Sequence, residues 1–424
     1  MIFPTPFYTP YVWLPLCAIF VLGLLDWRRL RRVAHLDLLV IVAGFGLSHY
    51  FVGRGELGLS VPLVYPVLVY LLARMLWLAF RGGEGLRPSA PALWLAVAAL
   101  LLTGFKVWLN VDASVVDVGY SGVIGADRIA DGETLYGNFP DDNRPGDTYG
   151  PFAYYAYVPF EQALPWSGEW DGLPAAHAAA ILFDLATLAG LFLLGRRLRR
   201  GEAGTALGAA LAFAWAACPY TAFALEPSTN DALVAALLVA TLLLISSPAL
   251  RGAALALSTA TKLAPALLFP LFASYRPDDP AGHEVASARS FARSAGRYAV
   301  AFALTLAIVA AQFLLDPGLA TLWERTIGYQ LGRNSIYSIW GQEPSLEWLQ
   351  TALKVAVVAL ALLVAVRPRR RDLVTISALG AAVLIGSQLS LSYWFYHYIP
   401  WFLPLVFVAL LARSGLSESS ARAR

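Results

Sequence analysis

The chain has 424 residues, of which 58% are hydrophobic and 14% are charged, and its formal net charge is +3. This composition is too apolar for an ordinary soluble protein, and so small a net charge does not predict a nucleic-acid partner. Apolar runs of about 20 residues recur, the length that a helix needs to cross a hydrocarbon core of roughly 30 Å. The sequence therefore predicts an all-α, polytopic membrane protein, organised as a single transmembrane domain over residues 1–424.

Eleven full crossings are expected in chain order. They are 10–26, 36–52, 61–80, 91–109, 175–194, 204–222, 231–248, 297–315, 349–366, 373–394 and 397–413. Four-arginine clusters follow the first, fifth and ninth of them, at Arg28–Arg32, Arg196–Arg200 and Arg367–Arg371. The positive-inside rule places these clusters in the cytoplasm. The N-terminus and the loops 110–172 and 316–347 are then outside the plasma membrane, and the tail 414–424 is cytoplasmic.

The apolar segment 251–274 breaks this alternation, because basic residues lie on both sides of it. One interpretation is a re-entrant pair of half-helices broken around Lys262 and Pro265, since proline disrupts a helix. Freed backbone groups at membrane depth are tolerated where they face protein or a cavity. The other interpretation is a kinked full crossing, and the sequence leaves both open.

The loop 110–172 contains eleven carboxylates, two arginines and eleven aromatic residues. Ordering so long a loop costs chain entropy, which indicates a functional segment. Helical spacing of Tyr120, Val123 and Ala126 predicts a helix over 117–131 that lies along the membrane surface with its apolar face down. Asp117 is its expected N-cap and Gly132 its expected C′ residue.

Asp117 is the candidate catalytic residue. It follows a membrane exit in a loop that is poor in counter-charges, where a carboxylate can act as general base on a hydroxyl. A purely structural role as helix cap explains its position equally well. Asp112 and Asp127 are the nearest competitors.

Cationic side chains supply candidate phosphate ligands. Lys262 lies at the predicted helix break, and Arg325 and Arg333 lie on the arginine-poor outer side, where a planar guanidinium suits phosphate. Tyr120, Asn230, Asp231, Asn334 and His397 complete the predicted substrate-binding set. An interfacial aromatic belt is the alternative explanation for His397 and its neighbours.

Charged residues inside the predicted spans also need a partner or a cavity. Asp184 is read as half of a structural ion pair or as part of a substrate site. Lys106 and Lys354 lie near the outer ends of their spans and are expected to snorkel to the interface.

Several familiar signals are missing from the sequence. It contains no glycine-rich nucleotide loop and no HExxH or paired Cys/His spacing, and its two cysteines lie in apolar runs. No cofactor and no metal site are therefore predicted, although acidic loops can bind cations and a divalent metal stays open.

The order of motifs resembles the GT-C superfamily of integral-membrane glycosyltransferases, and most closely glycosyltransferase family 87 with its polyprenol-phosphomannose-dependent mannosyltransferases. The similar segments are Asp117–Tyr120, Asp131–Tyr136, Thr148–Pro151, Ser228–Asp231, Thr261–Pro265, Gly332–Ser335 and Tyr398–Trp401. Thr229 departs from the histidine that one form of the family's motif carries there.

The resemblance implies a GT-C-like helical bundle that uses a polyprenyl-phosphate sugar as donor and a lipid or glycan as acceptor. Asp117 would then be the catalytic base of an inverting transfer of a hexose or pentose, most simply mannose. Three other classes stay open: a secondary transporter or lipid-linked saccharide flippase, an oligosaccharide ligase or polymerase, and a non-catalytic scaffold.

Overall fold

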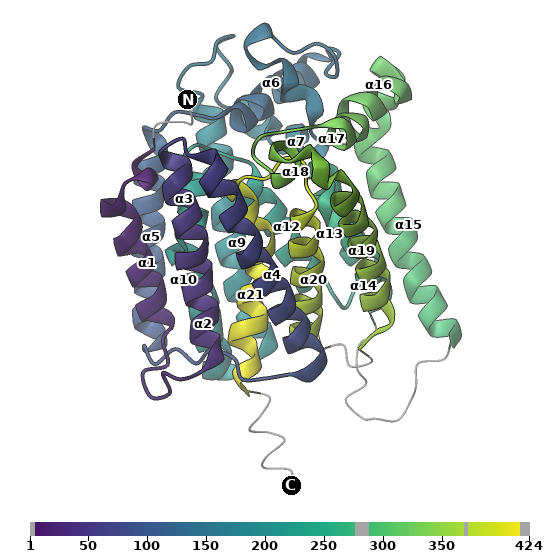
Figure 1. The fold of residues 1–424 in the computed structure, drawn as a ribbon. Coiled ribbons are helices and arrows are strands. Elements are labelled where there is room, and N and C mark those ends of the chain that lie inside the picture. Colours follow the sequence, from purple (N-terminus) through teal and green to yellow (C-terminus); the bar gives the residue numbers. More distant parts are fainter. Residues whose placement is uncertain (1–4, 276–287, 369–371, 416–424) are drawn as a thin grey trace.

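The computed structural model describes residues 5–275, 288–368 and 372–415, and within these ranges the regular structure is entirely helical. The helices stand side by side as one bundle, with shorter helices gathered across one end (Figure 1). Residues 416–424 of the predicted tail and 369–371 of the third arginine cluster lie outside the described residues.

Six helices among the described residues are long and apolar enough to cross a membrane. They are Val33–Gly53 (α2, η2 and α3), Leu57–Arg81 (α4), Ala92–Val111 (α5), Pro174–Leu198 (α9), Arg289–Gly332 (most of α15, Ala288–Phe313, with η5 to α17) and Pro344–Val366 (η7 and α19, Glu347–Val366). A seventh candidate is the pair α10 (Gly201–Ala217) and α11 (Pro219–Leu225), bent by 59° at Cys218. The protein is therefore a polytopic membrane protein, as its composition predicts.

Four of the five shorter apolar helices among the described residues stand with these long helices in the bundle. They are α1 (Pro10–Leu24), α12 (Asp231–Leu243), α20 (Leu373–Leu389) and α21 (Ile399–Leu411), the last preceded by the turn η8 (Tyr396–Tyr398). α20 and α21 are buried throughout and form the centre of the core. Every one of the eleven predicted spans overlaps one of these long or short helices.

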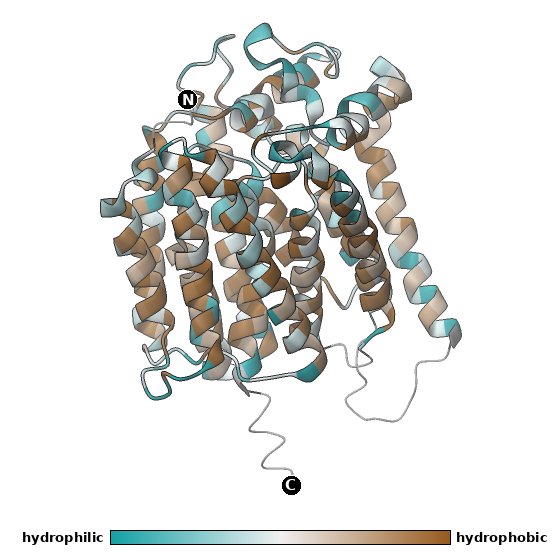
Figure 2. Ribbon diagram, viewed as in Figure 1, coloured by the Kyte–Doolittle hydropathy of each residue, from teal (hydrophilic) through white to brown (hydrophobic). Residues whose placement is uncertain are grey.

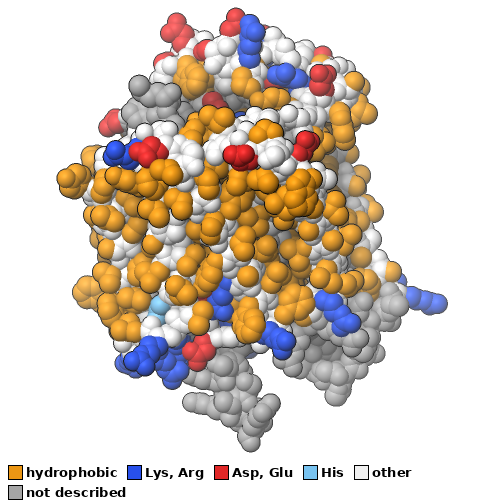
Figure 3. Space-filling model, viewed as in Figure 1, with side chains coloured by type: hydrophobic (Ala, Val, Ile, Leu, Met, Phe, Trp, Pro, Cys, Tyr) orange, Lys and Arg blue, Asp and Glu red, His pale blue; other side chains and the backbone are white. Residues whose placement is uncertain are grey.

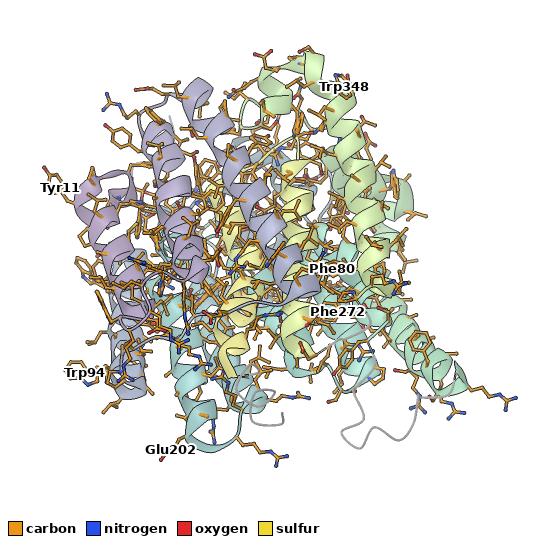
Figure 4. All side chains as sticks on the ribbon, turned by 60° about the horizontal axis from the view of Figure 1, so that its bottom comes forward. Tyr11, Phe80, Trp94, Glu202, Phe272 and Trp348 are labelled. Atoms are coloured by element: carbon orange, nitrogen blue, oxygen red, sulfur yellow. The ribbon has the colours of Figure 1, made fainter. Side chains whose placement is uncertain are left out.

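The outside of the bundle is a hydrophobic belt. Leu100, Leu101 and Trp108 on α5 and Ile308 on α15 are each about 70% exposed. The belt is apolar between two more polar ends (Figure 2), and in the space-filling view acidic side chains gather mainly at the α6 end and basic ones mainly at the other (Figure 3). Tyr11 and Trp94 point outward from its perimeter (Figure 4). Such a surface fits hydrocarbon rather than water.

Two of the three arginine clusters meet at one end of the bundle, which we call the basic end. Arg32 donates to the Gly85 carbonyl, Leu86 donates to the Leu410 carbonyl, and Arg199 donates to the Ala412 carbonyl. These bonds bring the first and second arginine clusters to the same end, as the charge pattern predicts. The opposite end carries α6 and the two large loops, and we call it the loop end (Figure 1).

The segment 251–274 is a hairpin. α13 (Pro248–Thr261) runs from the basic end to the loop end, the chain breaks at Lys262 in extended conformation, and η4 (Ala264–Leu268) and α14 (Phe269–Ala273) return. The Arg251 guanidinium lies 5.3 Å from the ring of Tyr275, so both ends of the segment are at the same level. The structure therefore shows the re-entrant arrangement, and the kinked full crossing is wrong.

The first outer loop contains α6 (Asp117–Asp131), η3 (Asp141–Thr148), α7 (Phe152–Tyr155) and α8 (Val158–Glu161). The bounds of α6 are those predicted, and Gly132 ends it in the left-handed region with φ of 70°. Two details of the prediction are wrong. Asp117 is the first helical residue rather than the N-cap, which is Val116. The apolar face also packs on protein, because Gly122 and Gly125 contact the rings of Tyr157 and Tyr154.

The second outer loop follows α15 as a series of short helical turns. These are η5 (Leu314–Gly318), α16 (Leu319–Trp323), η6 (Glu324–Gly328), α17 (Tyr329–Gly332), α18 (Ile339–Gln342) and η7 (Pro344–Leu346). Arg325 and Gln330 hydrogen-bond to residues of the first outer loop. The two loops are thereby joined over the loop end of the bundle.

Candidate functional site

A cavity of about 100 Å³ lies between the two outer loops and the loop ends of the core helices. It is polar and aromatic. Its lining consists of Asp117, Val118, Tyr149, Asp231, Arg333, Tyr337, Tyr393, Phe395, His397 and Tyr398. The cavity thus brings together residues from both outer loops, from α12 and from the segment before α21.

Asp117 presents the carboxylate of the first outer loop to this cavity. Asp117 is an exposed residue that lines the cavity, and the protein around the cavity partly buries its carboxylate. This burial raises the pKa of Asp117 above its usual value, although a hydrogen bond from the Val118 amide and the positive charges of Lys262 and Arg333 oppose the shift. A carboxylate with a raised pKa is a stronger base.

Asp231 is the second carboxylate of the cavity and opens α12. The Trp401 indole donates to its Oδ1 at 2.7 Å and fixes the orientation of the carboxylate. Asn230 precedes it as the N-cap residue, and its buried Oδ1 has no hydrogen-bond partner among the described residues. Asp231 is therefore a carboxylate of fixed orientation, and Asn230 beside it has a side-chain oxygen that could accept a further hydrogen bond.

Two cations lie beside these carboxylates, each stacked on an aromatic ring. The Arg333 guanidinium lies 3.7 Å from the centroid of Tyr393, and the Lys262 ammonium lies 4.0 Å from the centroid of Tyr149. The two charges come from different loops, since Lys262 is the tip of the hairpin. Gly150 makes this approach possible, because a Cβ there would collide with the Ala260 carbonyl.

His397 is buried in the wall of the cavity. Its ring lies 4.8 Å from Phe223 and 4.9 Å from Phe395, and its Nε2 has no hydrogen-bond partner among the described residues. Asp117, Asp231, Arg333 and His397 therefore line one cavity, and Lys262 adjoins it. These are five of the nine residues predicted for the site.

Three predicted residues lie elsewhere. Arg325 forms a bidentate salt bridge with the buried carboxylate of Asp147, with Nε 2.7 Å from Oδ2. Tyr120 is buried, stacks on Trp170 with ring centroids 4.8 Å apart, and donates to Asp142. Asn334 is exposed in an irregular stretch after α17, where its Oδ1 accepts a hydrogen bond from the Ser335 amide.

The charged residues of the spans form a structural pair. Lys106 is buried and donates to both oxygens of Asp184 at 2.8 and 2.9 Å, and Asp184 also accepts from the Trp215 indole. The expectation that Lys106 snorkels is wrong, because it lies inside the bundle with 2% of its surface exposed. Lys354 is exposed, as a snorkelling residue is.

Asn143 helps to position Asp117, and it was not predicted from the sequence. It lies in the proline- and glycine-rich run of the first outer loop, is buried, and donates through Nδ2 to the Asp117 carbonyl at 3.1 Å and to the Ser121 hydroxyl at 3.0 Å. These bonds fix the first turn of α6, which carries Asp117. Its sequence neighbours Asp142 and Arg144 are charged and exposed, so no local pattern indicates that this one side chain turns inward.

No group of three or more His, Cys, Asp or Glu side chains is arranged to hold a metal ion in the part of the chain that the structure describes. The cavity instead combines carboxylates with fixed cations and stacked aromatic rings. Such a set can bind a phosphate, cover the face of a sugar ring, and accept a proton from a hydroxyl.

Comparison with known proteins gives an independent assignment. No curated protein matches the sequence. Residues 148–391, more than half of the chain, match glycosyltransferase family 87. This region contains Tyr149, Asp231, Lys262 and Arg333, whereas Asp117 lies before it. The protein is an integral-membrane glycosyltransferase, and the chain belongs to glycosyltransferase family 87.

Proposed function

We propose that the protein transfers a hexose or pentose, most simply mannose, from a polyprenyl-phosphate donor to a lipid or glycan acceptor on the extracytoplasmic side of the plasma membrane. The observation that carries the proposal is one cavity in which Asp117 and Asp231 lie beside the cations Lys262 and Arg333. A phosphate leaving group and a hydroxyl nucleophile need opposite charges at one site, and this cavity supplies both.

In the proposed reaction the Asp117 carboxylate takes the proton of an acceptor hydroxyl. The acceptor oxygen then forms a bond to the anomeric carbon, and the bond from that carbon to the phosphate oxygen breaks. The electron pair leaves with the polyprenyl phosphate, and Lys262 and Arg333 stabilise its charge without reorganising. One displacement inverts the anomeric centre. Asp231, held by Trp401, would accept hydrogen bonds from sugar hydroxyls.

The proposed topology follows from the charge distribution. With the basic end in the cytoplasm, the eleven predicted spans give an outer N-terminus, an outer loop end and a cytoplasmic C-terminus in a GT-C-like single domain. A polyprenyl-phosphate sugar would reach the cavity laterally from the bilayer. No nucleotide is required on that side of the membrane.

The transporter and flippase alternative rests on Asp184 and Lys262 as coupling sites. Asp184 is paired with Lys106 and bound by Trp215, so it offers no open ion site. Lys262 adjoins the cavity of the proposed transferase instead. The ligase, polymerase and scaffold alternatives gain no support from the match to family 87.

The test is sugar transfer by purified protein in vesicles that contain radiolabelled polyprenyl-phosphate mannose and a lipid extract as acceptor. Asp117→Asn is expected to lower the transfer rate by at least about 100-fold, the lower end of the range for a general base. Asp112→Asn is the matched control, because Asp112 is an exposed carboxylate five positions earlier. Transfer by folded Asp117→Asn at the wild-type rate would refute the catalytic assignment.

A further inference from the structure

A second, larger cavity lies outside the site described above. It is a groove of about 420 Å³ between α1 and the η2–α3 segment, at the loop end of the bundle. Residues that line it include Trp13, Leu14, Cys17, Ala43, Gly46 and Leu47. Leu14 and Leu47 are 62% and 52% exposed on the same lipid-facing surface, so the groove opens onto hydrocarbon. Its volume lies within the range of small-ligand pockets.

Two residues that line the groove, Tyr8 and His49, each have a buried polar atom without a partner among the described residues. The Tyr8 hydroxyl and the His49 Nδ1 are buried and have no hydrogen-bond partner among the described residues. His49 stacks on Trp13 with ring centroids 4.4 Å apart and is held through Nε2 by the Phe7 carbonyl. Unsatisfied polar atoms at the end of an apolar groove fit a ligand with a hydrocarbon chain and a hydroxylated end.

The ring of Phe223 contacts residues of this groove and residues of the candidate cavity. Phe223 lies 5.7 Å from Tyr8 and 4.6 Å from His49, both of which line the groove. It also lies 6.1 Å from Phe395 and 4.8 Å from His397, both of which line the cavity. The polar end of a groove-bound chain would therefore be a single ring away from the cavity.

The two cations beside the cavity contact aromatic residues that do not line the groove. Lys262 stacks on Tyr149 of the first outer loop, and Arg333 stacks on Tyr393. Neither residue lines the groove. The cavity thus has a cationic part suited to a phosphate and an uncharged aromatic part, formed by Phe395 and His397, that leads to the groove.

We propose that the α1–α3 groove holds the hydrocarbon chain of the acceptor, which is therefore an amphiphilic lipid with a hydroxylated head group. The head group passes Phe223 and presents a hydroxyl to Asp117, while the donor phosphate occupies the cationic part of the cavity. This inference rests on the proposed glycosyl transfer and selects the lipid from the two acceptor classes. The groove opens onto the hydrocarbon of the membrane. A membrane supplies lipid hydrocarbon chains rather than soluble glycans, and this favours a lipid as the occupant.

Binding is tested with a dodecyl mannoside that carries a diazirine at the end of its chain, on the full-length protein in detergent-free nanodiscs. Crosslinks are expected within Pro10–Leu24 or Val40–Gly53. Cys17→Trp fills the groove and is expected to lower this crosslinking at least fivefold. Ala43→Trp fills the groove from the facing helix and is expected to lower the crosslinking in the same way. Ala18→Trp is the matched control, because Ala18 is exposed on the same helix and does not line the groove.

The acceptor role is tested by transfer to ethyl, octyl and dodecyl mannosides. The KM for the dodecyl acceptor is expected to rise at least tenfold in Cys17→Trp relative to Ala18→Trp, while kcat/KM for the ethyl acceptor is unchanged. Crosslinks spread over the whole lipid-facing surface, or equal KM values in the two variants, would overturn the proposal. Neither result bears on the proposed transfer reaction, which is tested separately with the Asp117→Asn variant.

Discussion

Arg325 in the second outer loop and Asp147 in the first form a bidentate salt bridge, in which the Asp147 carboxylate is fully buried. Asp147 also accepts a hydrogen bond from the Gly137 amide at 2.6 Å. This pair joins the two loops that enclose the candidate cavity. Arg325 is therefore a structural residue in this arrangement rather than a free phosphate ligand.

We expect Arg325→Ala to destabilise the protein by about 2 kcal/mol, because it leaves the buried Asp147 carboxylate without its charged donor. Arg325→Lys should recover only part of this, since an ammonium cannot make the planar two-bond contact. Thermal unfolding in detergent measures the effect. The control is Arg144→Ala, whose ion pair with Asp141 is exposed and should contribute almost nothing. Equal melting temperatures for Arg325→Ala and Arg144→Ala would contradict the structural role.

The raised pKa of Asp117 predicts opposite effects of its ionisation on activity and on stability. The ionised base is lost as the pH falls through the raised pKa, so the acid limb of kcat/KM should lie above pH 3.8. The folded state holds the proton more tightly than the unfolded chain does. Protonation therefore stabilises the fold at low pH, and this contribution is lost as the pH rises through the raised pKa.

Asp117→Asn should consequently unfold at a higher temperature than wild type at pH 7, although the proposed mechanism predicts a large loss of its activity. The difference should shrink as the pH is lowered towards 4, because the wild-type carboxyl then becomes neutral too. Melting curves over this pH range test the expectation. A lower melting temperature for Asp117→Asn at pH 7 would show that its partners Lys262 and Arg333 outweigh the burial of the charge.

Asn143 is predicted to position Asp117. Asn143→Ala removes the bonds to the Asp117 carbonyl and the Ser121 hydroxyl, and the freed first turn of α6 should lower kcat about tenfold, since small displacements of a reacting group are costly. The KM for the donor should change little. Asn138→Ala is the control, because Asn138 is exposed and its side chain donates to the Thr134 carbonyl rather than to α6. A matching loss in both variants would argue against a positioning role.

The buried pair of Lys106 and Asp184 gives a stability prediction. Lys106→Met leaves the Asp184 charge uncompensated and should cost about 3–5 kcal/mol. The double variant Lys106→Met/Asp184→Leu should regain most of this loss, because it removes both charges. Lys354→Met at an exposed position should have little effect. A double variant as unstable as Lys106→Met would contradict this account, and melting temperatures decide the matter.

Orientation can be measured by cysteine labelling in a background without Cys17 and Cys218. Ser167→Cys in the first outer loop should react with a membrane-impermeant maleimide in intact cells. Glu202→Cys is exposed at the basic end and should react only after permeabilisation (Figure 4). The reverse pattern would invert the proposed topology and place the cavity in the cytoplasm.

The parts of the fold that local rules determine were predictable. The bounds of α6 follow from helical spacing and from Gly132, and the grouping of the arginine clusters follows from the positive-inside rule. The sequence left two interpretations of the segment 251–274 open, a hairpin and a kinked crossing. Proline and flanking charge identify a break in the helix but not the direction of the chain after it. The Arg251–Tyr275 contact decides that direction, and it joins residues far apart in sequence.

The site was only partly predictable, because it is assembled from long-range contacts. Lys262 and Arg333 stand out by charge in apolar or arginine-poor surroundings, and Asp117 stands out by its position just after a membrane exit. Nothing local indicates that Arg325 finds Asp147 across 178 positions, or that Lys106 finds Asp184 across 78. Tyr120 lies on the predicted face of α6, and only the packing of Trp170 on its ring shows that this face belongs to the core.

The hairpin has a consequence for how the protein is made. The 14 residues of α13 extend roughly 21 Å, too short to cross a hydrocarbon core of about 30 Å without support. Gly252 lets α13 pack directly on the backbone of α15 at Tyr298, a helix that is synthesised later. The contact that holds the hairpin against α15 can therefore form only after α15 has been synthesised.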